Sequence, residues 1–242
     1  MNGPVALHGG GEFLPGDEPF LRAMLEFAAR VGDPVRVAVV PTAAARGRPA
    51  LAAAHGVDAF RRVAADLGVA ILAEAVPVVD AASAADPALA DRLAAATLIH
   101  LPGGDPDLIP KLYPGSAAWA AMQRARTDGA VLAGASAGAM ALAAWTWTPA
   151  GGVPGLGIVP GIVVAPHADA ASWDNSLARY GATVPPDIGL IGVAERTAVI
   201  VPGTAGEPWR VVGQGEARWL SATERANGAP PVIARDGETI EP

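Results

Sequence analysis

The segment Val131-Leu132-Ala133-Gly134-Ala135-Ser136-Ala137-Gly138-Ala139-Met140 joins a short apolar run to an alanine-rich helical stretch. Small residues on both sides of Ser136 let the chain turn sharply from a strand into a helix and push the hydroxyl outward. The free N–H groups and the positive end of that helix point at the same place, where they would meet an oxyanion. The pattern predicts a nucleophile elbow; the alternative is a closely packed turn without chemistry.

Apolar runs and amphipathic segments alternate before this turn. We expect strands at Pro4–Leu7, Val35–Val40, Val69–Val76 and Thr97–Leu101, and helices at Phe20–Val31, Leu51–Leu67 and Asp86–Ala96. Short strands that are apolar on both faces and alternate with helices indicate a mostly parallel central sheet flanked by helices on both faces. Ligands of such α/β sheets bind beyond the carboxyl ends of the strands. Three loops should therefore meet: Gly9-Gly10-Gly11, Gly103-Gly104-Asp105 and the turn at Ser136.

After the turn, the Gly- and Pro-rich residues Pro149–Gly161 predict a loop with one short strand. Beyond it we expect a strand at Ile162–Ala165, a helix at Trp173–Tyr180, strands at Ile188–Val193 and Ala198–Val201, and short antiparallel strands at Trp209–Gly213, Ala217–Leu220 and Pro231–Ala234. No repeat, charge block or linker interrupts the chain, so residues 1–242 are expected to form a single α/β domain.

Composition narrows the classes of function. No apolar stretch reaches the roughly 18 residues that span a bilayer, and the first residues lack a secretory signal, so we expect a soluble, cytoplasmic protein. The chain has no cysteine, which excludes disulfides, a thiolate nucleophile and cysteine-based metal sites. We expect neither a metal nor a cofactor.

Charge points to the class of partner. A net charge of -7 without a basic stripe argues against nucleic acid, so small molecules or peptides are the expected partners. Six tryptophans and apolar tail strands are compatible with a homodimer.

A serine nucleophile needs a base, and the chain offers four histidines. His167 is favoured because it follows a predicted strand and is the only histidine after Ser136. His55 is expected on a solvated helix surface, and His100 is expected in the core with its ring bonded to backbone. His8 borders the glycine loop, where it either lines the site or is incidental.

The third member of the site is chosen by its position in the chain. No Asp or Glu lies between Ser136 and His167, which excludes the chain order Ser, acid, His of α/β-hydrolases. Glu195, at the end of a predicted strand, is the best-placed acid, with Asp169 and Asp187 as alternatives. An acid at that position could instead form a structural ion pair, which would leave a Ser–His dyad.

Taken together, these motifs resemble the cyanophycinase and dipeptidase E family of serine peptidases. The resemblance is carried by Gly9-Gly10-Gly11, Gly103-Gly104-Asp105, the Ser136 turn, His167 after a strand, and Ile191-Gly192-Val193-Ala194-Glu195-Arg196-Thr197-Ala198, which is similar to the Gly-Ile-Asp-Glu-x-Thr-Ala segment of cyanophycinases. It implies a flavodoxin-like fold of the class I glutamine amidotransferase type, with Ser in place of Cys. It also implies Ser136 as nucleophile, His167 as base, and an oxyanion hole of N–H groups near Gly104 and Ala137.

One departure from the family bears on the substrate. Cyanophycinases carry closely spaced arginines after the catalytic histidine, whereas here no arginine follows His167 before Arg179. Asp169 and Asp174 occupy this segment instead and would repel a substrate carboxylate. Cyanophycin and aspartyl dipeptides are therefore disfavoured as substrates.

The sequence thus predicts a serine exopeptidase or dipeptidase-like hydrolase that acts on short peptides through an acyl-enzyme. Its expected catalytic residues are Ser136, His167 and Glu195. The residues expected to form the oxyanion hole or to contact the substrate are Gly103, Gly104, Asp105, Ala137, Gly10, Gly11 and Asp169. The alternatives are a non-catalytic binding member of the same fold and a hydrolase of small esters.

Overall fold

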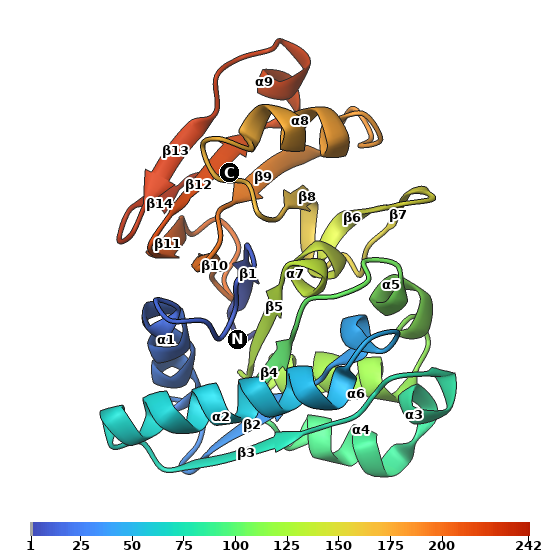
Figure 1. Ribbon diagram of the computed structural model, residues 1–242, viewed down its shortest axis with the longest axis vertical. Helices are drawn as coiled ribbons and strands as arrows, with labels where there is room; N and C mark the ends of the chain where they lie inside the picture. The colour runs from blue at the N-terminus through green and yellow to red at the C-terminus, as the bar shows by residue number, and fades with distance from the viewer. Residues whose placement is uncertain (1) are drawn as a thin grey trace.

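The computed structural model describes residues 2–242, which form two β-sheets and their covering helices (Figure 1). The first sheet has the strand order β14-β11-β10-β1-β5-β4-β2-β3. Strands β1, β5, β4, β2 and β3 are parallel to one another, and β10, β11 and β14 extend the sheet by antiparallel pairing. Their bounds are β1 Val5–His8, β2 Val35–Val39, β3 Ile71–Ala75, β4 Leu98–Leu101, β5 Val131–Ala135, β10 Thr197–Val201, β11 Trp209–Gly213 and β14 Thr239–Ile240. The expected α/β fold with a mostly parallel sheet is confirmed.

A second sheet of order β13-β12-β9-β8-β6-β7 was not foreseen from the sequence. Its strands are β6 Ala143–Thr148, β7 Gly151–Pro154, β8 Val159–Ala165, β9 Gly189–Val193, β12 Glu216–Leu220 and β13 Val232–Arg235. The alanine-rich helix α7 (Ala137–Leu142) ends after six residues and runs straight into β6. The alternating Trp and Thr residues of β6 favour a strand, because aromatic and β-branched side chains pack well on a pleated surface. Much of the predicted loop at Pro149–Gly161 belongs to β7 and the start of β8.

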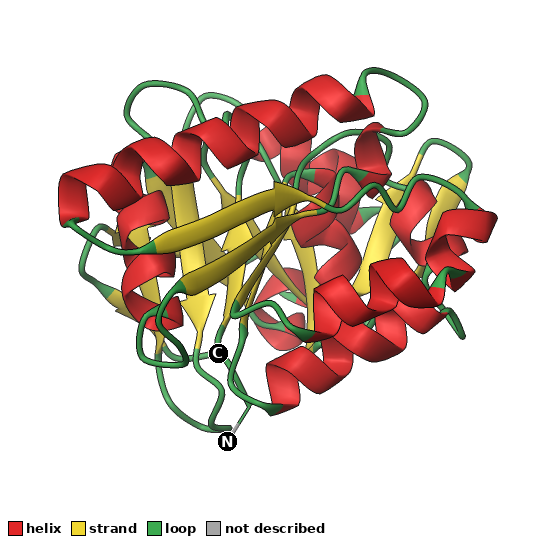
Figure 2. Cartoon of the chain, turned by 90° about the horizontal axis from the view of Figure 1, so that it is seen from below, coloured by secondary structure: helices red, strands yellow, loops and turns green. Residues whose placement is uncertain are grey.

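Helices cover both faces of the first sheet (Figure 2). Side chains of each strand alternate between two apolar clusters: Val37 and Val39 pack with α1 and α2, and Ala38 and Val40 pack with α4 and α6. This two-sided burial explains the continuous apolar runs seen in the sequence. The helices are α1 Glu18–Ala28, α2 Pro49–Leu67, α3 Ala81–Ala85, α4 Pro87–Ala94, α5 Leu108–Leu112, α6 Ala117–Thr127, α8 Trp173–Gly181 and α9 Ala222–Ala226, with a 3₁₀ turn at Thr42–Ala44. None of the helices formed by residues 2–242 is long and apolar enough to cross a membrane.

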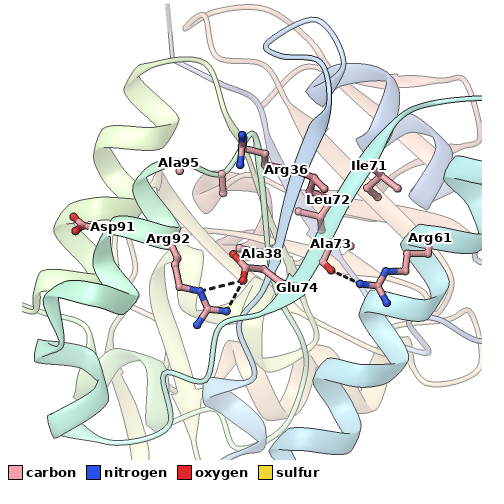
Figure 3. A pocket seen from close by; sticks show the side chains of 12 residues that line it. Arg36, Ala38, Arg61, Ile71, Leu72, Ala73, Glu74, Asp91, Arg92 and Ala95 are labelled. Carbon is pink, nitrogen blue, oxygen red and sulfur yellow. Dashed lines mark hydrogen bonds and ion pairs between the residues drawn. The ribbon is translucent and has the colours of Figure 1, made fainter.

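The outer edge of the first sheet is strand β3, and arginines from the two flanking helices cap it (Figure 3). Arg61 of α2 donates to the carbonyl of Ala73 at 2.8 Å, and Arg92 of α4 donates to the carbonyl of Ala75 at 2.6 Å. A hollow of about 590 Å³ lies here, and its lining includes none of the predicted site residues. The arginines occupy two carbonyls that an added strand would need, which disfavours strand addition at this edge.

Candidate active site

The turn at Ser136 has the backbone geometry of a nucleophile elbow. Ser136 stands between the end of β5 and the start of α7 with φ 48° and ψ −114°, a region that residues other than glycine rarely adopt. A Cβ atom at Gly134 would overlap the backbone of Gly138, so this tight approach of strand to helix requires glycine. The N–H of Ser136 donates to the carbonyl of His8 at 2.9 Å, which fixes the turn to strand β1.

His167 and Glu195 come from the second sheet. Strands β8 and β9 pair in parallel, with Ala165 opposite Gly192, so the residues that follow their carboxyl ends lie side by side. His167 is two residues beyond β8, and Glu195 is two residues beyond β9. The segment from Ala194 to Arg196 then crosses to β10 in the first sheet. The carboxyl ends of β8 and β9 therefore lie close to the junction of β5 and α7, where Ser136 stands.

The three side chains form one hydrogen-bonded series. Ser136 Oγ lies 3.0 Å from His167 Nε2, and His167 Nδ1 lies 2.9 Å from Glu195 Oε1. A carboxylate that accepts the Nδ1–H proton leaves Nε2 free to accept a proton from the serine hydroxyl. The side chains of His167 and Glu195 are 49% and 48% exposed, so the series opens to solvent and a ligand can reach it.

The alternative acids do not contact His167. The Asp169 carboxylate accepts the backbone N–H of Ser172 at 2.8 Å, and this hydrogen bond lowers the pKa of Asp169. Within residues 2–242, neither Asp169 nor Asp187 forms a hydrogen bond with the imidazole. Among the acids considered, the structure therefore brings only Glu195 to the ring.

The glycine loop packs against the series and ties the two sheets together. The Gly9 carbonyl accepts the N–H of His167, and the Gly10 carbonyl accepts the N–H of Arg196, both at 2.8 Å. Gly10 has φ 115°, and a Cβ atom there would overlap the ring of His167. A Cβ atom at Gly11 would lie 3.2 Å from Glu195 Oε2. The loop thus forms the wall behind the imidazole and the carboxylate.

Replacing Gly10 with alanine is expected to lower kcat/KM by about 100-fold, because the added methyl displaces the His167 ring and misplacing a catalytic group by about 1 Å costs that much. Steady-state hydrolysis of a short peptide measures the loss. Gly151→Ala is the matched control, since Gly151 has φ 120° and nothing within 4 Å of the added Cβ. A Gly10→Ala variant as active as Gly151→Ala would contradict this account of the loop.

The loop that follows β4 lies on the other side of Ser136. A Cβ atom built on Gly103 would be 3.1 Å from the Ser136 Cβ, so Gly103 adjoins Ser136. Gly104 packs against the backbone of Ala43, and the Asp105 carboxylate accepts Arg46 Nη1 at 3.1 Å. Gly103 and Ala137 therefore lie next to Ser136, whereas Asp105 is engaged by Arg46.

Sequence reasoning missed Glu12. Its Oε1 accepts the N–H of Gly103 at 2.8 Å, which places a carboxylate close to Ser136. The available signal was its position directly after Gly9-Gly10-Gly11, in a loop already assigned to the site.

The three other histidines lie outside the series. His8 is buried, with Nε2 2.7 Å from Asp17 Oδ1, while its Nδ1 accepts the N–H of Gly10. His55 is exposed on α2. His100 is buried, but the expectation that its ring bonds to backbone is wrong: within residues 2–242 neither ring nitrogen has a hydrogen-bond partner. Its ring lies among the rings of Phe13, Phe20 and Phe60. The backbone groups of β4 pair with β2 and β5 and are not bonded to the imidazole.

A hollow of about 660 Å³ opens beside His167. It is lined by Pro166 and His167, which follow β8, and by residues at the start of and within α8, including Ser172, Asn175 and Arg179. The Arg179 guanidinium lies 5.4 Å from the centre of the Trp147 ring, which holds the arginine at this wall.

Comparison with known proteins places the chain in a family. The model of peptidase family S51 matches residues 5–207. The chain belongs to peptidase family S51. This S51 chain is 28% identical to a peptidase from an acI-B1 actinobacterium, whose crystal structure superposes with a TM-score of 0.82 over 100% of this chain and 97% of that one. A putative peptidase E protein from Listeria monocytogenes EGD-e has 13% identity, a TM-score of 0.59, and coverage of 89% and 99% respectively, and so shares the fold. A search of curated proteins found no significant match.

These findings confirm the resemblance to the cyanophycinase and dipeptidase E family. They support a peptidase of the serine type for this S51 chain.

Proposed function

We propose that this S51 peptidase is a serine exopeptidase that hydrolyses short peptides through an acyl-enzyme on Ser136. The observation that carries the proposal is the continuous series from Ser136 Oγ through the His167 imidazole to the Glu195 carboxylate, with steps of 3.0 and 2.9 Å. Nucleophile, base and orienting acid within hydrogen-bond reach of one another are what covalent catalysis by serine requires.

Acylation begins when His167 Nε2 takes the hydroxyl proton as Ser136 Oγ attacks the carbonyl carbon of the substrate. The carbonyl π electrons move to the oxygen, and the backbone N–H groups near Gly104 and Ala137 are the proposed donors to this oxyanion. The first N–H groups of α7 have no partner within the helix, which supports that role for Ala137. Glu195 holds the Nδ1–H proton and stabilises the imidazolium that forms.

The tetrahedral intermediate then loses its C–N bond. His167 donates the proton from Nε2 to the departing amine, which leaves the acyl group on Ser136. Water attacks the acyl carbon while His167 accepts one of its protons, and the same proton returns to Ser136 Oγ when the C–O bond to the enzyme breaks. The products are a free amine and a free carboxylic acid.

The openness of the site supports a short substrate. About half of the His167 and Glu195 side-chain surface is exposed, and the adjoining hollow of about 660 Å³ has the size of a small-molecule site. A ligand of one or a few residues fits a site built from loops at the ends of two sheets.

A panel of free dipeptides and L-aminoacyl p-nitroanilides tests the proposed function. We expect amide hydrolysis and covalent labelling of Ser136 by a fluorophosphonate, located by peptide mass spectrometry. Turnover of small esters without amide turnover would favour an esterase. A folded sample that neither hydrolyses the panel nor takes up the label would favour a binding protein of the same fold.

A further inference from the structure

The carboxylate of Glu12 lies beside Ser136 but outside the series of proposed catalytic residues. Its Oε1 accepts the Gly103 N–H at 2.8 Å. A Cβ atom built on Gly103 would be 3.1 Å from this oxygen and 3.1 Å from the Ser136 Cβ. A single glycine therefore separates the acid from the nucleophile. Glu12 is partly exposed, so a bound ligand can reach it.

The other carboxylates near Ser136 already have partners. Glu195 is bonded to His167, and Asp105 forms an ion pair with Arg46. Glu12 accepts a neutral backbone N–H, and no arginine, lysine or histidine of residues 2–242 forms an ion pair with it. Its charge is therefore free to pair with a cation supplied by a ligand.

A peptide with a free amino terminus would bring a cation, its α-ammonium group, close to Glu12. In a peptide cleaved after its first residue, the α-ammonium group is two bonds from the carbonyl carbon that Ser136 attacks. A carboxylate one residue away from the nucleophile lies within reach of this ammonium. Hydrogen bonds between charged groups are roughly twice as strong as neutral ones, so such a contact discriminates strongly between a free and a blocked amino terminus.

We propose that Glu12 pairs with the α-ammonium group of the substrate and so restricts the enzyme to peptides with an unblocked amino terminus. The inference rests on the proposed function and deepens it, because it states which end of the peptide the site recognises. Glu12 is then a specificity-determining residue, and the acyl group on Ser136 is a single amino-terminal residue.

The variant Glu12→Gln tests this role, since its amide oxygen still accepts the Gly103 N–H but carries no charge. We expect kcat/KM for the best L-aminoacyl p-nitroanilide to fall by about 10- to 100-fold, mainly through KM. Hydrolysis of the N-acetylated form of the same compound should change by less than about twofold, because it has no charge to lose. Glu18→Gln is the matched control: the Glu18 carboxylate accepts the Gly16 N–H at 2.8 Å, at the start of α1, and its loss should leave both rates unchanged.

Two results would overturn the proposal. An equal loss with the free and the N-acetylated compound would show that Glu12 only holds the Gly103 loop in place. Faster hydrolysis of both compounds by Glu12→Gln would show that the carboxylate obstructs the site.

Binding to an inactive protein separates this inference from the proposed function. Ser136→Ala should bind L-alanyl-L-alanine at least about 10-fold more tightly than N-acetyl-L-alanyl-L-alanine in calorimetry, and Ser136→Ala/Glu12→Gln should lose that preference. If hydrolysis and fluorophosphonate labelling both fail, the proposed function fails, and this comparison still decides the role of Glu12. Equal affinity of Ser136→Ala for the two dipeptides would refute it.

Discussion

Ser136→Ala is expected to lower kcat/KM for a hydrolysed dipeptide by about 10⁴-fold or more, because it removes the oxygen proposed to attack the carbonyl carbon. His167 and Glu195 would remain paired at 2.9 Å but would have no hydroxyl to deprotonate. The thermal unfolding midpoint should stay close to that of the wild type, since within residues 2–242 the Ser136 side chain makes its hydrogen bond only with the half-exposed His167. Initial rates over a range of substrate concentrations measure the loss.

Ser116→Ala is the matched control for this variant. Ser116 also stands directly before a helix, where its side chain accepts the N–H of Trp119 at 3.1 Å. Its loss should cost about 1 kcal/mol of stability as a lost helix cap and leave kcat/KM unchanged. Retention by Ser136→Ala of more than a tenth of the wild-type rate would exclude Ser136 as the nucleophile.

Local patterns were enough to predict the sharp turn at Ser136 and the parallel half of the fold. The small residues around Ser136 are typical of a tight turn from strand to helix. The unbroken apolar runs indicate strands that are buried on both faces. Glu195 was the preferred acid because it follows a predicted strand and no acid lies between Ser136 and His167, with Asp169 and Asp187 as alternatives. These inferences needed only neighbours in sequence or a count along the chain.

The features that could not be predicted from local patterns depend on contacts between segments far apart in the chain. Whether a strand joins the first or the second sheet depends on hydrogen bonds between distant segments, such as β9 with β12 and β10 with β1. The role of Glu12 depends on a contact with Gly103, 91 residues away. The lack of a partner for His100 likewise appears only when Phe13, Phe20 and Phe60 converge on its ring from three other segments.

The same convergence explains why the site lies where the sheets meet. The first sheet supplies Ser136 and the glycine loop, and the second supplies His167 and Glu195. The backbone N–H groups of His167 and Arg196 donate to the carbonyls of Gly9 and Gly10, which holds the residues from the two sheets in place relative to one another. These hydrogen bonds therefore add to the packing between the two sheets in fixing His167 relative to Ser136.

Acid is expected to destabilise the protein through His100. Burial, and to a smaller extent the nearby His8, lowers the pKa of this histidine from 6.5 to about 3. Between these values the unfolded chain binds a proton that the folded chain does not, so the free energy of unfolding decreases as the pH falls below 6.5. At about 1.4 kcal/mol for each pH unit below 6.5, the free energy of unfolding should be about 2 kcal/mol lower at pH 5.

His100→Leu isolates this contribution, because leucine fills a similar volume among the same three phenylalanine rings and does not titrate. Urea unfolding at pH 7 and pH 5 should show wild type losing about 2 kcal/mol more than His100→Leu. At pH 7 the variant should be at least as stable as wild type, since it removes buried nitrogens that have no partner within residues 2–242. His55→Gln, on the exposed surface of α2, should retain the wild-type pH dependence. Equal pH dependence in wild type and His100→Leu would mean that the buried ring takes up its proton without unfolding, and the aromatic cluster would then have to admit water or open locally at pH 5.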